Sequence, residues 1–476
     1  MTHPPAPHSD IPLSLDVSSP DSGPRGAARS SLSEILSALS FALDLTEGQR
    51  PGHTIRSCII GMRLGEEIGL SAEDRIALYF ALLLKDAGCS SNAARMAALF
   101  GSDDQSVKFR MKMVDWHRPV RLAVQTALNC GVGRSIPERL RRFREIAATE
   151  NMTRSLMQIR CDRGADISLR LGFPVATADA IRALDEHWCG FGHPQGMKAG
   201  EIPVLARIAN LAQVVEVFFT AHGVGAALRV AKTRSGRWFD PVLVNRVLSW
   251  KRDRAWWSRL ADNAAVGSEV VALEPGSVPR SVDSAGVDAI ARAFAEIIDA
   301  KTPYTARHSS NVAAYAVAIG REMGFGTSEL DRLYRAGLLH DIGKLGVSNL
   351  ILDKQGKLTP EERAAVEKHP LFTWEILRRV SAFEDIAWLA SVHHEKLDRT
   401  GYPWQLPGDQ LDTPARILAV ADIFEALTAD RPYRAGMPPE KAIAILRSES
   451  ATKLCPDAVA GCEGWLRRDA GAVAVA

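Results

Sequence analysis

The stretch RLYRAGLLHDIGK, residues 332–344, combines an apolar helical pattern with a histidine–aspartate pair near its end. After His222 the chain contains only five histidines, and a further aspartate, Asp422, lies in the apolar stretch ILAVADIFEAL. The five are His308, His340, His369, His393 and His394. A lone buried histidine is usually a core residue, but this many histidines with two aspartates on separate predicted helices are poorly explained by packing. Such a set is typical of a two-metal site for Fe, Mn, Ni or Zn.

An all-α fold is predicted along nearly the whole chain. Apolar residues recur at spacings of three and four from Ser31 almost to the C-terminus, and no run of alternating β-branched residues competes with them. Residues 1–30 are rich in Pro, Ser and Gly, which predicts a disordered tail. A similar segment at 263–284 is interpreted as a linker. The sequence therefore predicts two helical domains, at 31–262 and 285–465.

Composition and charge restrict the classes of protein to which the chain can belong. Its 476 residues include 58 Lys and Arg against 56 Asp and Glu, so the net charge of +2 gives no strong field for non-specific nucleic-acid binding. Seven cysteines without a CxxC motif favour a reducing compartment. The longest apolar run, residues 76–84, is too short to cross a bilayer, and the first residues lack a signal-peptide pattern. We expect a cytoplasmic protein with no membrane and no specific nucleic-acid partner.

The two predicted domains resemble each other. His53 aligns with His308 and Lys85 with His340 at a constant offset of 255 residues, and the motif GFGHPQG aligns with RTGYPWQ at an offset of 209. The difference between the offsets places 46 additional residues in the first domain, between Lys85 and Arg160. We interpret the pair as an ancient tandem duplication with an inserted segment in its first copy.

The motifs of the second domain together resemble the HD-GYP subfamily of HD-domain metal-dependent phosphohydrolases. The resemblance covers about residues 285–460 and rests on a histidine followed by an HD pair, then HP, HHEKLDRTGYP and a final aspartate in an apolar helix. It implies tandem all-α HD-domain bundles, the first degenerate and the second an HD-GYP domain. It also implies hydrolysis of the bacterial second messenger cyclic di-GMP to pGpG or GMP.

The resemblance assigns the metal ligands residue by residue. Two divalent transition-metal ions, Fe or Mn before Ni or Zn, would share Asp341 as a bridging and catalytic residue. The first ion would also use His308, His340 and Asp422, and the second His369, His393 and His394. A hydroxide that bridges the ions would attack phosphorus, because water bound to two cations loses a proton near neutral pH.

Three basic residues are candidates for binding the substrate phosphates. Lys344 resembles the lysine of the family's HDxGK motif and would act as a catalytic cation beside the scissile phosphate, whereas the alternative is a solvated lysine near a helix C-terminus. Arg431 and Arg434, in DRPYR, match family positions that bind the second phosphate. The planar guanidinium group suits that task, and surface salt bridges are the alternative.

Residues around the histidine pair are expected to shape the site rather than to do chemistry. Gly401, Tyr402 and Pro403 are predicted to form the loop that follows the pair. Glu395 is interpreted either as a carboxylate that orients a ligand histidine or as a surface residue. Some family members have a glutamate four residues before the first histidine that contributes to a third metal. This sequence has Tyr304 there, which favours a two-metal site.

The first domain lacks most of the ligand set. His53 and Asp86 remain, but the positions that match the other five ligands hold Lys85, Arg160, Leu184, Asp185 and Gln213. Two ligands cannot hold a pair of cations, so we expect a regulatory or structural role, such as forming a homodimer or contacting signalling proteins. A vestigial nucleotide-binding pocket is the alternative, because Lys85 and Arg160 would attract a phosphate.

Two other functions stay open for the second domain. The metal ligands specify phosphoester cleavage better than they specify guanine, so one alternative is an HD phosphohydrolase that acts on another nucleotide. The other is a non-catalytic nucleotide-binding signalling scaffold, because the first domain indicates that a site of this kind can be lost. Retention of the ligand set argues against the scaffold, and the ligand set together with the intact GYP motif favours the cyclic di-GMP phosphodiesterase.

Overall fold

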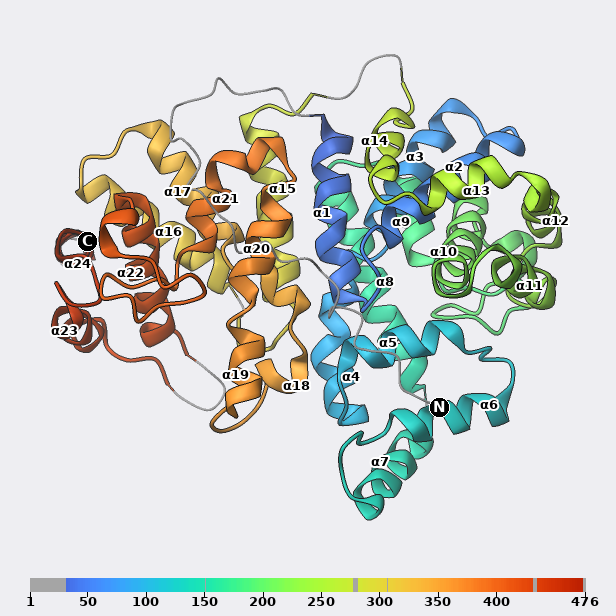
Figure 1. Cartoon of the computed structure of the whole chain (residues 1–476), viewed down its shortest axis with the longest axis horizontal. Helices are drawn as coiled ribbons and strands as arrows, with labels where there is room; N and C mark the ends of the chain where they lie inside the picture. The colour runs from blue at the N-terminus through green and yellow to red at the C-terminus, as the bar shows by residue number, and fades with distance from the viewer. Residues whose placement is uncertain (1–30, 150, 277–280, 306, 431–434, 474–476) are drawn as a thin grey trace. The chain divides into compact units, whose positions relative to one another are not determined.

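The computed structural model of the protein describes residues 31–149, 151–276, 281–305, 307–430 and 435–473. Within these residues the chain forms α-helices joined by turns and short 3-10 helices, and no β-strand is present (Figure 1). The prediction of an all-α fold is confirmed. The predicted tail, residues 1–30, lies outside the described residues.

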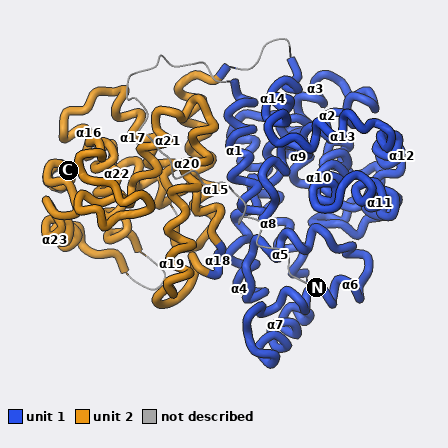
Figure 2. Tube along the Cα trace, in the orientation of Figure 1, with its two compact units in different colours: residues 1–11, 30–281, 348–350 blue, residues 12–29, 282–347, 351–476 orange. Residues whose placement is uncertain are grey.

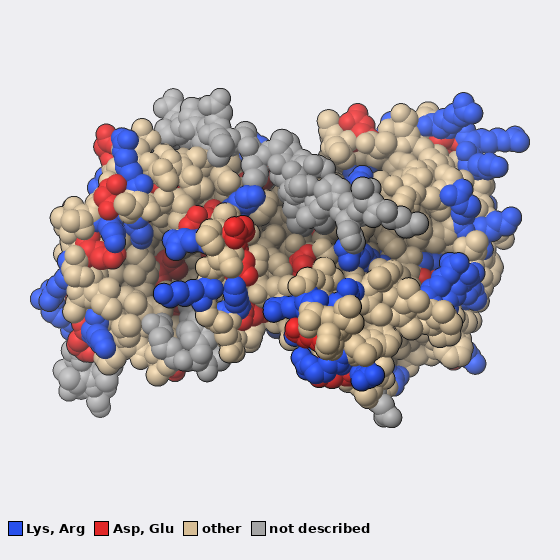
Figure 3. Space-filling view, turned by 60° about the horizontal axis from the view of Figure 1, so that its bottom comes forward, with Lys and Arg blue, Asp and Glu red and all other residues tan. Residues whose placement is uncertain are grey.

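Two compact units divide the described chain (Figure 2). Unit 1 comprises residues 31–281 with the short segment 348–350, and unit 2 comprises the rest of the described chain from residue 282 onward. Basic and acidic side chains are interspersed on the molecular face drawn in Figure 3. This mixture accords with the near-balance of charge in the sequence.

Unit 1 is a helical bundle around α10 (Val204–His222), against which α2, α3, α9 and α11 pack. By length and composition alone α10 could cross a membrane, but 67% of its most apolar window is buried inside the fold, as in a core helix. The other main helices of the bundle are α1 (Leu32–Thr46), α2 (His53–Glu67), α3 (Ala72–Leu84), α8 (Met152–Arg170), α9 (Val175–Arg182), α11 (Val224–Arg234), α12 (Pro241–Ser249) and α13 (Arg254–Ala261).

The stretch between Lys85 and Arg160, which contains the predicted insertion, folds into short helices with a small core of their own. These helices are η1 (Cys89–Asn92), α4 (Ala93–Phe100), α5 (Asp104–Met113), α6 (Pro119–Asn129) and α7 (Ile136–Ala148). Phe100, Val107 and Ile146 are buried together in this core. The additional residues therefore build a packed substructure on unit 1 rather than a long loop.

The predicted linker at 263–284 is partly wrong. Its first half contains helix α14 (Ala265–Ala272), which packs against α1 and α2. Val266 and Val270, one helical turn apart, are buried, and the Tyr79 hydroxyl donates a hydrogen bond to the carbonyl of Val270 at 2.9 Å. The Gly, Pro and Ser residues that follow obscured this short apolar helix in the sequence, so the first domain extends beyond residue 262.

Unit 2 is a second bundle, in which α16 packs against α17, α22 and α24. The described helices of this part of the chain are α15 (Ser284–Asp299), α16 (His308–Glu322), α17 (Thr327–Leu339), η4 (Ile342–Gly346), α18 (Asn349–Leu352), α19 (Pro360–Val366), α20 (His369–Leu377), η5 (Ser381–Phe383), α21 (Glu384–Ser391), η6 (Gly408–Gln410), α22 (Thr413–Thr428), α23 (Pro439–Glu449) and α24 (Pro456–Val473). Apolar residues of α16, α17, α21 and α22 fill its core.

Local sequence signals set the ends of the helices that carry the candidate site. The side chain of Asp412 accepts a hydrogen bond from the backbone N–H of Ala415 at 3.0 Å and so caps the N-terminus of α22. A proline occupies the first turn of α20, where its missing N–H leaves no helical bond unmade. Gly343, in the HDIGK turn, has no room for a side chain, because a Cβ there would lie 1.9 Å from the carbonyl oxygen of His369.

Candidate metal centre

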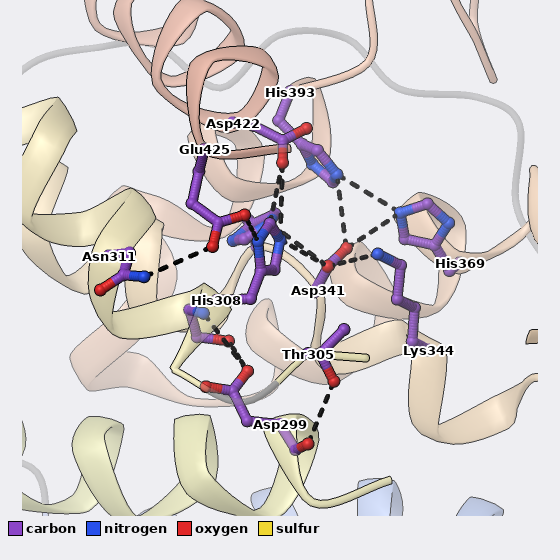
Figure 4. Close-up of polar contacts among 12 residues, drawn as sticks. Asp299, Thr305, His308, Asn311, Asp341, Lys344, His369, His393, Asp422 and Glu425 are labelled. Atoms are coloured by element: carbon purple, nitrogen blue, oxygen red, sulfur yellow. Dashed lines mark hydrogen bonds and ion pairs between the residues drawn. The ribbon is translucent and has the colours of Figure 1, made fainter. Parts of the chain in front are cut away.

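The seven predicted ligands come together inside unit 2, most of them at helix ends. Figure 4 labels His308, Asp341, His369, His393 and Asp422 among them. His308 is the first residue of α16 and His369 the first of α20. His340 directly follows α17, and His393 and His394 lie in the turn after α21. Asp422 projects from the middle of α22. Helix ends therefore place these side chains around one buried point.

Asp341 lies at the centre of the cluster, with its two oxygens facing different histidine pairs. Oδ2 is 3.3 Å from Nε2 of both His308 and His340. Oδ1 is 3.3 Å from Nε2 of His369 and 3.7 Å from Nε2 of His393. This is the arrangement required of a carboxylate that bridges two cations.

The remaining two residues lie on the open edge of the cluster. Asp422 Oδ1 is 3.5 Å from Nε2 of His308, and its Oδ2 is 3.8 Å from Nδ1 of His394. By mutual distance the ligand atoms form two groups, each within 4.8 Å: Asp341, His369, His393 and His394, and His308, His340 and Asp422. The structure thus brings together every residue of the predicted ligand set, and metal binding itself stays a prediction.

The imidazole rings are oriented by hydrogen bonds from their other nitrogens. Nδ1 of His340, His369 and His393 each lies 2.7–2.8 Å from the carbonyl oxygen three residues earlier in the chain. A carbonyl only accepts, so each Nδ1 carries a proton and Nε2 is the nitrogen that faces Asp341. Outer contacts of this kind fix the tautomer and direction of metal-binding histidines.

Glu425 is a site residue that the sequence analysis missed. Its Oε2 is 2.5 Å from Nδ1 of His308, and its Oε1 accepts a hydrogen bond from Nδ2 of Asn311 at 3.4 Å. Glu425 is buried and lies three residues after Asp422, on the same face of α22. A carboxylate in an apolar helix at this spacing from a candidate ligand was the available signal.

The buried atoms at the centre are mostly hydrogen-bond acceptors, which are the atoms that a metal ion would bind. Nε2 of His340 and Oδ1 of Asp341 have no hydrogen-bond partner among the described residues. Burial lowers the pKa of His369, His393 and His394, so these rings are neutral at pH 7. Lone pairs and carboxylate oxygens that face one another in a buried site require a cation between them. Imidazoles and carboxylates in these numbers fit divalent transition metals.

Two positive groups contact the central carboxylates. Burial opposes protonation of His308, but hydrogen bonds to Asp341 and Glu425 raise its pKa to about 10. The ammonium of Lys344 contacts Oδ2 of Asp341. Burial alone would raise the pKa of Asp341, yet the neighbouring His340 and Lys344 hold it well below its usual range. Lys344 is 23% exposed, so it lies at the border between the buried cluster and solvent.

The GYP residues lie directly against the histidine pair. A Cβ on Gly401 would lie 2.5 Å from the Cα of Glu395, so only glycine fits. The ring of Tyr402 lies 4.7 Å from that of His394, and the Tyr402–Pro403 peptide bond is cis. The placement of these residues supports the predicted loop-shaping role.

Both sequence interpretations of Glu395 are wrong. Its side chain is 2% exposed, so it is not a surface carboxylate. It accepts hydrogen bonds from the backbone N–H groups of Trp404, Gln405 and Leu406 at 2.8, 3.2 and 3.0 Å, and the described residues provide no histidine partner for it. Glu395 therefore holds the loop after the GYP residues rather than a ligand ring.

Three predicted positions do not join the described cluster. Arg431 and Arg434 lie outside the described residues, so their role as phosphate ligands stays a prediction. Tyr304 is half-buried before α16 and offers a phenol where a carboxylate would be needed for a third metal. The two groups of ligands described above therefore account for the candidate centre.

The matching residues of unit 1 form a different cluster. The ammonium of Lys85 is 3.0 Å from Nε2 of His53 and contacts Oδ2 of Asp86, while Nη2 of Arg160 is 2.8 Å from Oδ2 of Asp185. Leu184 and Gln213 are also buried, but their side chains carry no charge.

A third group of candidate metal ligands, Glu47, Asp86 and Cys89, also lies in unit 1. Lys112 Nζ is 2.7 Å from Oε2 of Glu47 and 3.8 Å from Oδ1 of Asp86, so a side-chain cation already neutralises these carboxylates. Burial also raises the pKa of Cys89 well above its usual range, which disfavours the thiolate that metals bind. We expect no metal at this group.

Comparisons with known proteins identify the family. An HD domain model matches residues 292–457. A 3′3′-cGAMP-specific phosphodiesterase of Vibrio cholerae is 44% identical over 432 residues, which cover 90% of this chain and 93% of the relative. A cyclic di-GMP phosphodiesterase of Pseudomonas aeruginosa is 41% identical over 143 residues, 29% of this chain and 34% of that protein.

A solved structure resembles the whole chain as well. The crystal structure of a cyclic GMP-AMP-specific phosphodiesterase of Vibrio cholerae has a TM-score of 0.63 and 39% identity, and the match covers 92% of this chain and 98% of that one. The match extends over both units, and unit 2 of this chain contains the HDIGK, HHE and GYP motifs. The chain therefore belongs to the HD-GYP family of HD-domain phosphodiesterases.

Proposed function

We propose that this chain is a metal-dependent phosphodiesterase that opens a 3′3′-linked cyclic dinucleotide, with 3′3′-cGAMP as its preferred substrate. The reaction class is supported above all by the position of Asp341, whose two oxygens face separate histidine pairs. The preference for cGAMP is supported by the relative of that specificity, which aligns with 90% of the chain. Cyclic di-GMP, expected from the sequence, is the second candidate, because the Pseudomonas aeruginosa relative named for that substrate aligns with only 29% of this chain.

The proposed metal-binding residues divide into the two sets that share Asp341. One ion would be held by His308, His340, Asp341 and Asp422, and the other by Asp341, His369, His393 and His394. Such a pair, when bound, stabilises negative charge on a phosphate and lowers the pKa of water for attack on phosphorus. The seven side chains are mostly buried, so their charges act in a medium of low dielectric constant.

The protein groups around these ligands have separate tasks in the proposed reaction. The carbonyl acceptors at Nδ1 and the carboxylate of Glu425 keep the rings aimed at the centre, which lowers the reorganisation needed during the reaction. Lys344, at the border with solvent, would donate a hydrogen bond to a phosphate oxygen and offset the charge gained when the P–O bond breaks. Tyr402 would limit access beside His394.

We also propose that unit 1 is a degenerate copy of the same domain without catalytic metal. The support is a set of contacts that recur at the sequence offsets of 255 and 209. One example is the glutamate that contacts Nδ1 of the first histidine, which is Glu216 in unit 1 and, 209 residues later, Glu425 in unit 2. A regulatory or structural role follows for unit 1, since its ligand positions hold Lys85 and Arg160.

A hydrolysis assay with product analysis tests the function. The full chain, loaded with Mn or Fe, is given 3′3′-cGAMP and cyclic di-GMP under the same conditions, and products are separated by chromatography. We expect opening of both rings and a kcat/KM at least about tenfold higher for cGAMP, because a pocket built for one base discriminates by roughly 1–3 kcal/mol. Equal rates would contradict the preference, and cleavage of another nucleotide alone would contradict the substrate class.

Elemental analysis separates the enzyme from a scaffold. About two transition-metal ions per chain are expected from the two ligand groups. A chain that is purified with no such metal, and that binds a cyclic dinucleotide without cleaving it after metal is added, would support the non-catalytic alternative. Product identity as linear dinucleotide or mononucleotide is read from the same chromatograms.

A further inference from the structure

The hydroxyl of Thr373, in α20, joins two segments that carry candidate metal ligands. Its Oγ1 donates a hydrogen bond to the carbonyl of His340 at 2.8 Å and accepts one from the backbone N–H of Gly343 at 3.1 Å. Thr373 is fully buried, and the two backbone groups that it contacts lie on either side of Asp341 in the chain. A single side chain therefore ties the HDIGK turn to the helix that begins with His369.

This contact differs from the one that a threonine commonly makes inside a helix. Such a hydroxyl usually donates to a carbonyl of its own helix, three or four residues earlier. Thr428 does so in α22, where its Oγ1 donates to the carbonyl of Phe424 at 2.8 Å. Thr373 instead donates to a carbonyl 33 residues away in the sequence. The contact is therefore tertiary, and it fixes one segment against another rather than the local turn of α20.

The joined segments belong to both proposed sets of metal ligands. His340 is a ligand of the first ion and His369 of the second, while Asp341 is shared. Thr373 lies four residues after His369, on the same side of α20. Nε2 of His369 is 3.3 Å from Oδ1 of Asp341 (Figure 4). A shift of the turn along α20 would change this distance, because His340 and Asp341 would move together while His369 stays with its helix.

Unit 1 keeps the close packing of this turn but lacks the hydroxyl. Gly88 matches Gly343 at the offset of 255 residues, and Gly164 matches Thr373 at the offset of 209. A Cβ on Gly88 would lie 2.7 Å from the backbone nitrogen of Gly164, and one on Gly343 would lie 2.7 Å from that of Thr373. The turn thus packs against its helix equally closely in both units. The hydroxyl is not needed for this packing, and it is present in the unit with the complete ligand set.

From these contacts we infer that Thr373 is a positioning residue of the metal centre, whose hydroxyl aligns His369 with the shared carboxylate of Asp341. The inference rests on the proposed function, because it takes the seven residues as ligands of two metal ions. Thr373 acts through these ligands rather than on the ions, since its one side-chain oxygen is already bonded to two backbone groups. Removal of an outer contact of this kind lowers metal affinity about 10–100-fold.

The variant Thr373→Val removes the hydroxyl and keeps the branched shape, and it tests the inference in the full chain loaded with Mn. We expect the first ion to bind as in the wild type, because its ligands do not belong to α20. The dissociation constant of the second ion should rise about 10–100-fold. Chelator competition measures both constants. Thr373→Ser, which keeps the hydroxyl, should restore the affinity for the second ion.

Electron paramagnetic resonance gives a readout that does not depend on activity. Two Mn ions that share a carboxylate give a spin-coupled signal, whereas a single ion gives the signal of isolated Mn. At a Mn concentration that fills both positions of the wild type, Thr373→Val should therefore show mainly the isolated signal. A spin-coupled signal as strong as that of the wild type would overturn the inference.

A matched control is Thr177→Val in unit 1. Thr177 is also fully buried, and its Oγ1 donates to the carbonyl of Ala77 at 3.1 Å, which joins α9 to α3. This variant also loses a buried hydrogen bond between two segments, so its thermal midpoint should fall. Both Mn dissociation constants and the spin-coupled signal should stay unchanged. An equal loss of Mn affinity in Thr177→Val and Thr373→Val would reveal a general effect of stability and would overturn the inference.

Metal binding by the wild type separates this inference from the function on which it rests. A wild-type chain that binds no pair of Mn ions would contradict the proposed function and the inference with it. A pair that binds to Thr373→Val as tightly as to the wild type would contradict only the positioning role. If Thr373→Val does not fold, Thr373→Ala gives the same test, because alanine favours a helix. Failure of both variants to fold would also overturn the inference, since the hydroxyl would then be needed for the fold itself.

Discussion

The two units share a framework of hydrogen bonds but differ in the charged side chains at its centre. In unit 2, Oδ1 of Asp299 accepts from the backbone and the hydroxyl of Ser309 at 3.2 and 2.7 Å. In unit 1, Oδ1 of Asp44 accepts from the backbone and the hydroxyl of Thr54 at 2.9 and 2.7 Å. The pair in unit 2 lies 255 residues after the pair in unit 1. In each unit the contact fixes the start of the helix that carries the first histidine.

The carboxylate behind that histidine is also repeated. Glu425 contacts Nδ1 of His308 in unit 2, and Glu216 contacts Nδ1 of His53 in unit 1. The second oxygen of Glu216 accepts from Nε of Arg56 at 2.7 Å, where Asn311 occupies the matching place in unit 2. The contact that orients the ring is therefore present in both units, although the positions around His53 hold Lys85 and Arg160 in place of the ligand histidines of unit 2.

The loop after the histidine pair shows the same correspondence. Glu186 accepts from the backbone N–H groups of Gln195 and Gly196 at 2.6 and 3.1 Å in unit 1. The matching carboxylate in unit 2, Glu395, holds Trp404 and Gln405. These contacts tie a helix end to a loop, so they stabilise the fold whether or not metal is bound.

The difference lies at the centre of each cluster. In unit 2, Asp341 faces four imidazole nitrogens, and the ammonium of Lys344 that contacts it lies at the border with solvent. In unit 1, the ammonium of Lys85 contacts Asp86 and lies 3.0 Å from His53. An internal lysine thus supplies the positive charge that the carboxylate needs. The framework therefore stabilises the fold in both units. The side chains at the centre determine whether the cluster suits metal ions or forms an internal ion pair.

The largest expected contrast is between Asp341→Asn and Asp86→Asn. The first removes the shared carboxylate of unit 2, so we expect loss of bound metal and a decrease in kcat of roughly a thousandfold or more. The second leaves Lys85 and Lys112 short of a buried carboxylate, so we expect about 3–5 kcal/mol lower stability of unit 1 with metal content retained. Elemental analysis, turnover and thermal unfolding of both variants make the comparison. A loss of metal in Asp86→Asn would contradict the assignment of the metals to unit 2.

Next in size is a pair of glycine substitutions that should affect both units alike. A Cβ on Gly343 would lie 1.9 Å from the carbonyl oxygen of His369, and one on Gly88 would lie 1.8 Å from that of Arg160. Both clashes are with backbone, so each alanine variant should lose about 3 kcal/mol of stability. Gly343→Ala should also weaken metal binding, because it displaces the start of α20.

The control for these glycines is Gly267→Ala in α14, where nothing lies within 4 Å of an added Cβ. It should leave the denaturant midpoint unchanged or slightly raised, since alanine favours a helix. Equal stability of wild type and Gly88→Ala in denaturant titration would show that the tight contact in unit 1 differs from that in unit 2.

A smaller effect is expected from the repeated glutamates. Glu425→Gln keeps the shape of the side chain but weakens the hold on His308, so metal affinity should fall about 10–100-fold. Chelator competition on the full chain measures that shift. Glu216→Gln, the matched change in unit 1, should leave metal affinity unchanged and lower only the stability of unit 1, because Arg56 loses its carboxylate. A similar loss of metal affinity in both variants would contradict the assignment of the metals to unit 2.

The sequence predicted the helical class and the ligand set because both depend on short-range patterns. Spacing of apolar residues indicates helices, and the motifs around His340 and His393 carry the family resemblance. The short helix α14 was missed because its apolar turn is flanked by loop-forming residues, so that tertiary packing against α1 and α2 decides its conformation. Its signal was too short to outweigh the composition around it.

The roles of the acidic residues could not be read from the sequence. Glu395 follows the histidine pair directly, which suggested a partner for a ring, but the loop folds back and offers it three backbone N–H groups. Glu425 is distant in sequence from His308, and only the packing of α16 on α22 brings them together. Likewise, the lysine at position 85 indicated loss of a ligand but not that its ammonium would contact Asp86.

The smallest expected effect is the response of unit 1 to acid. Burial alone would raise the pKa of Glu216, but the charges of His53 and Arg56 and hydrogen bonds from His53 and Thr220 lower it to about 2. A carboxyl group with a lowered pKa in the folded state stabilises the fold above the pKa of the unfolded chain, and this stability is lost as the pH falls toward 2. Glu216 alone should therefore cost unit 1 about 1 kcal/mol between pH 6 and pH 4.

Hydrogen exchange of peptides from α2 and α10, corrected for the intrinsic effect of pH, measures this loss within unit 1. Glu216→Gln removes the titrating group, so its unit 1 should be less stable at pH 6 but should change less between pH 6 and pH 4. Glu73→Gln, at an exposed position of α3, is the control and should keep the wild-type dependence. If Glu216→Gln also keeps that dependence, the carboxylate is not held ionised by His53 and Arg56, and the internal ion pairs of unit 1 are weaker than their distances imply.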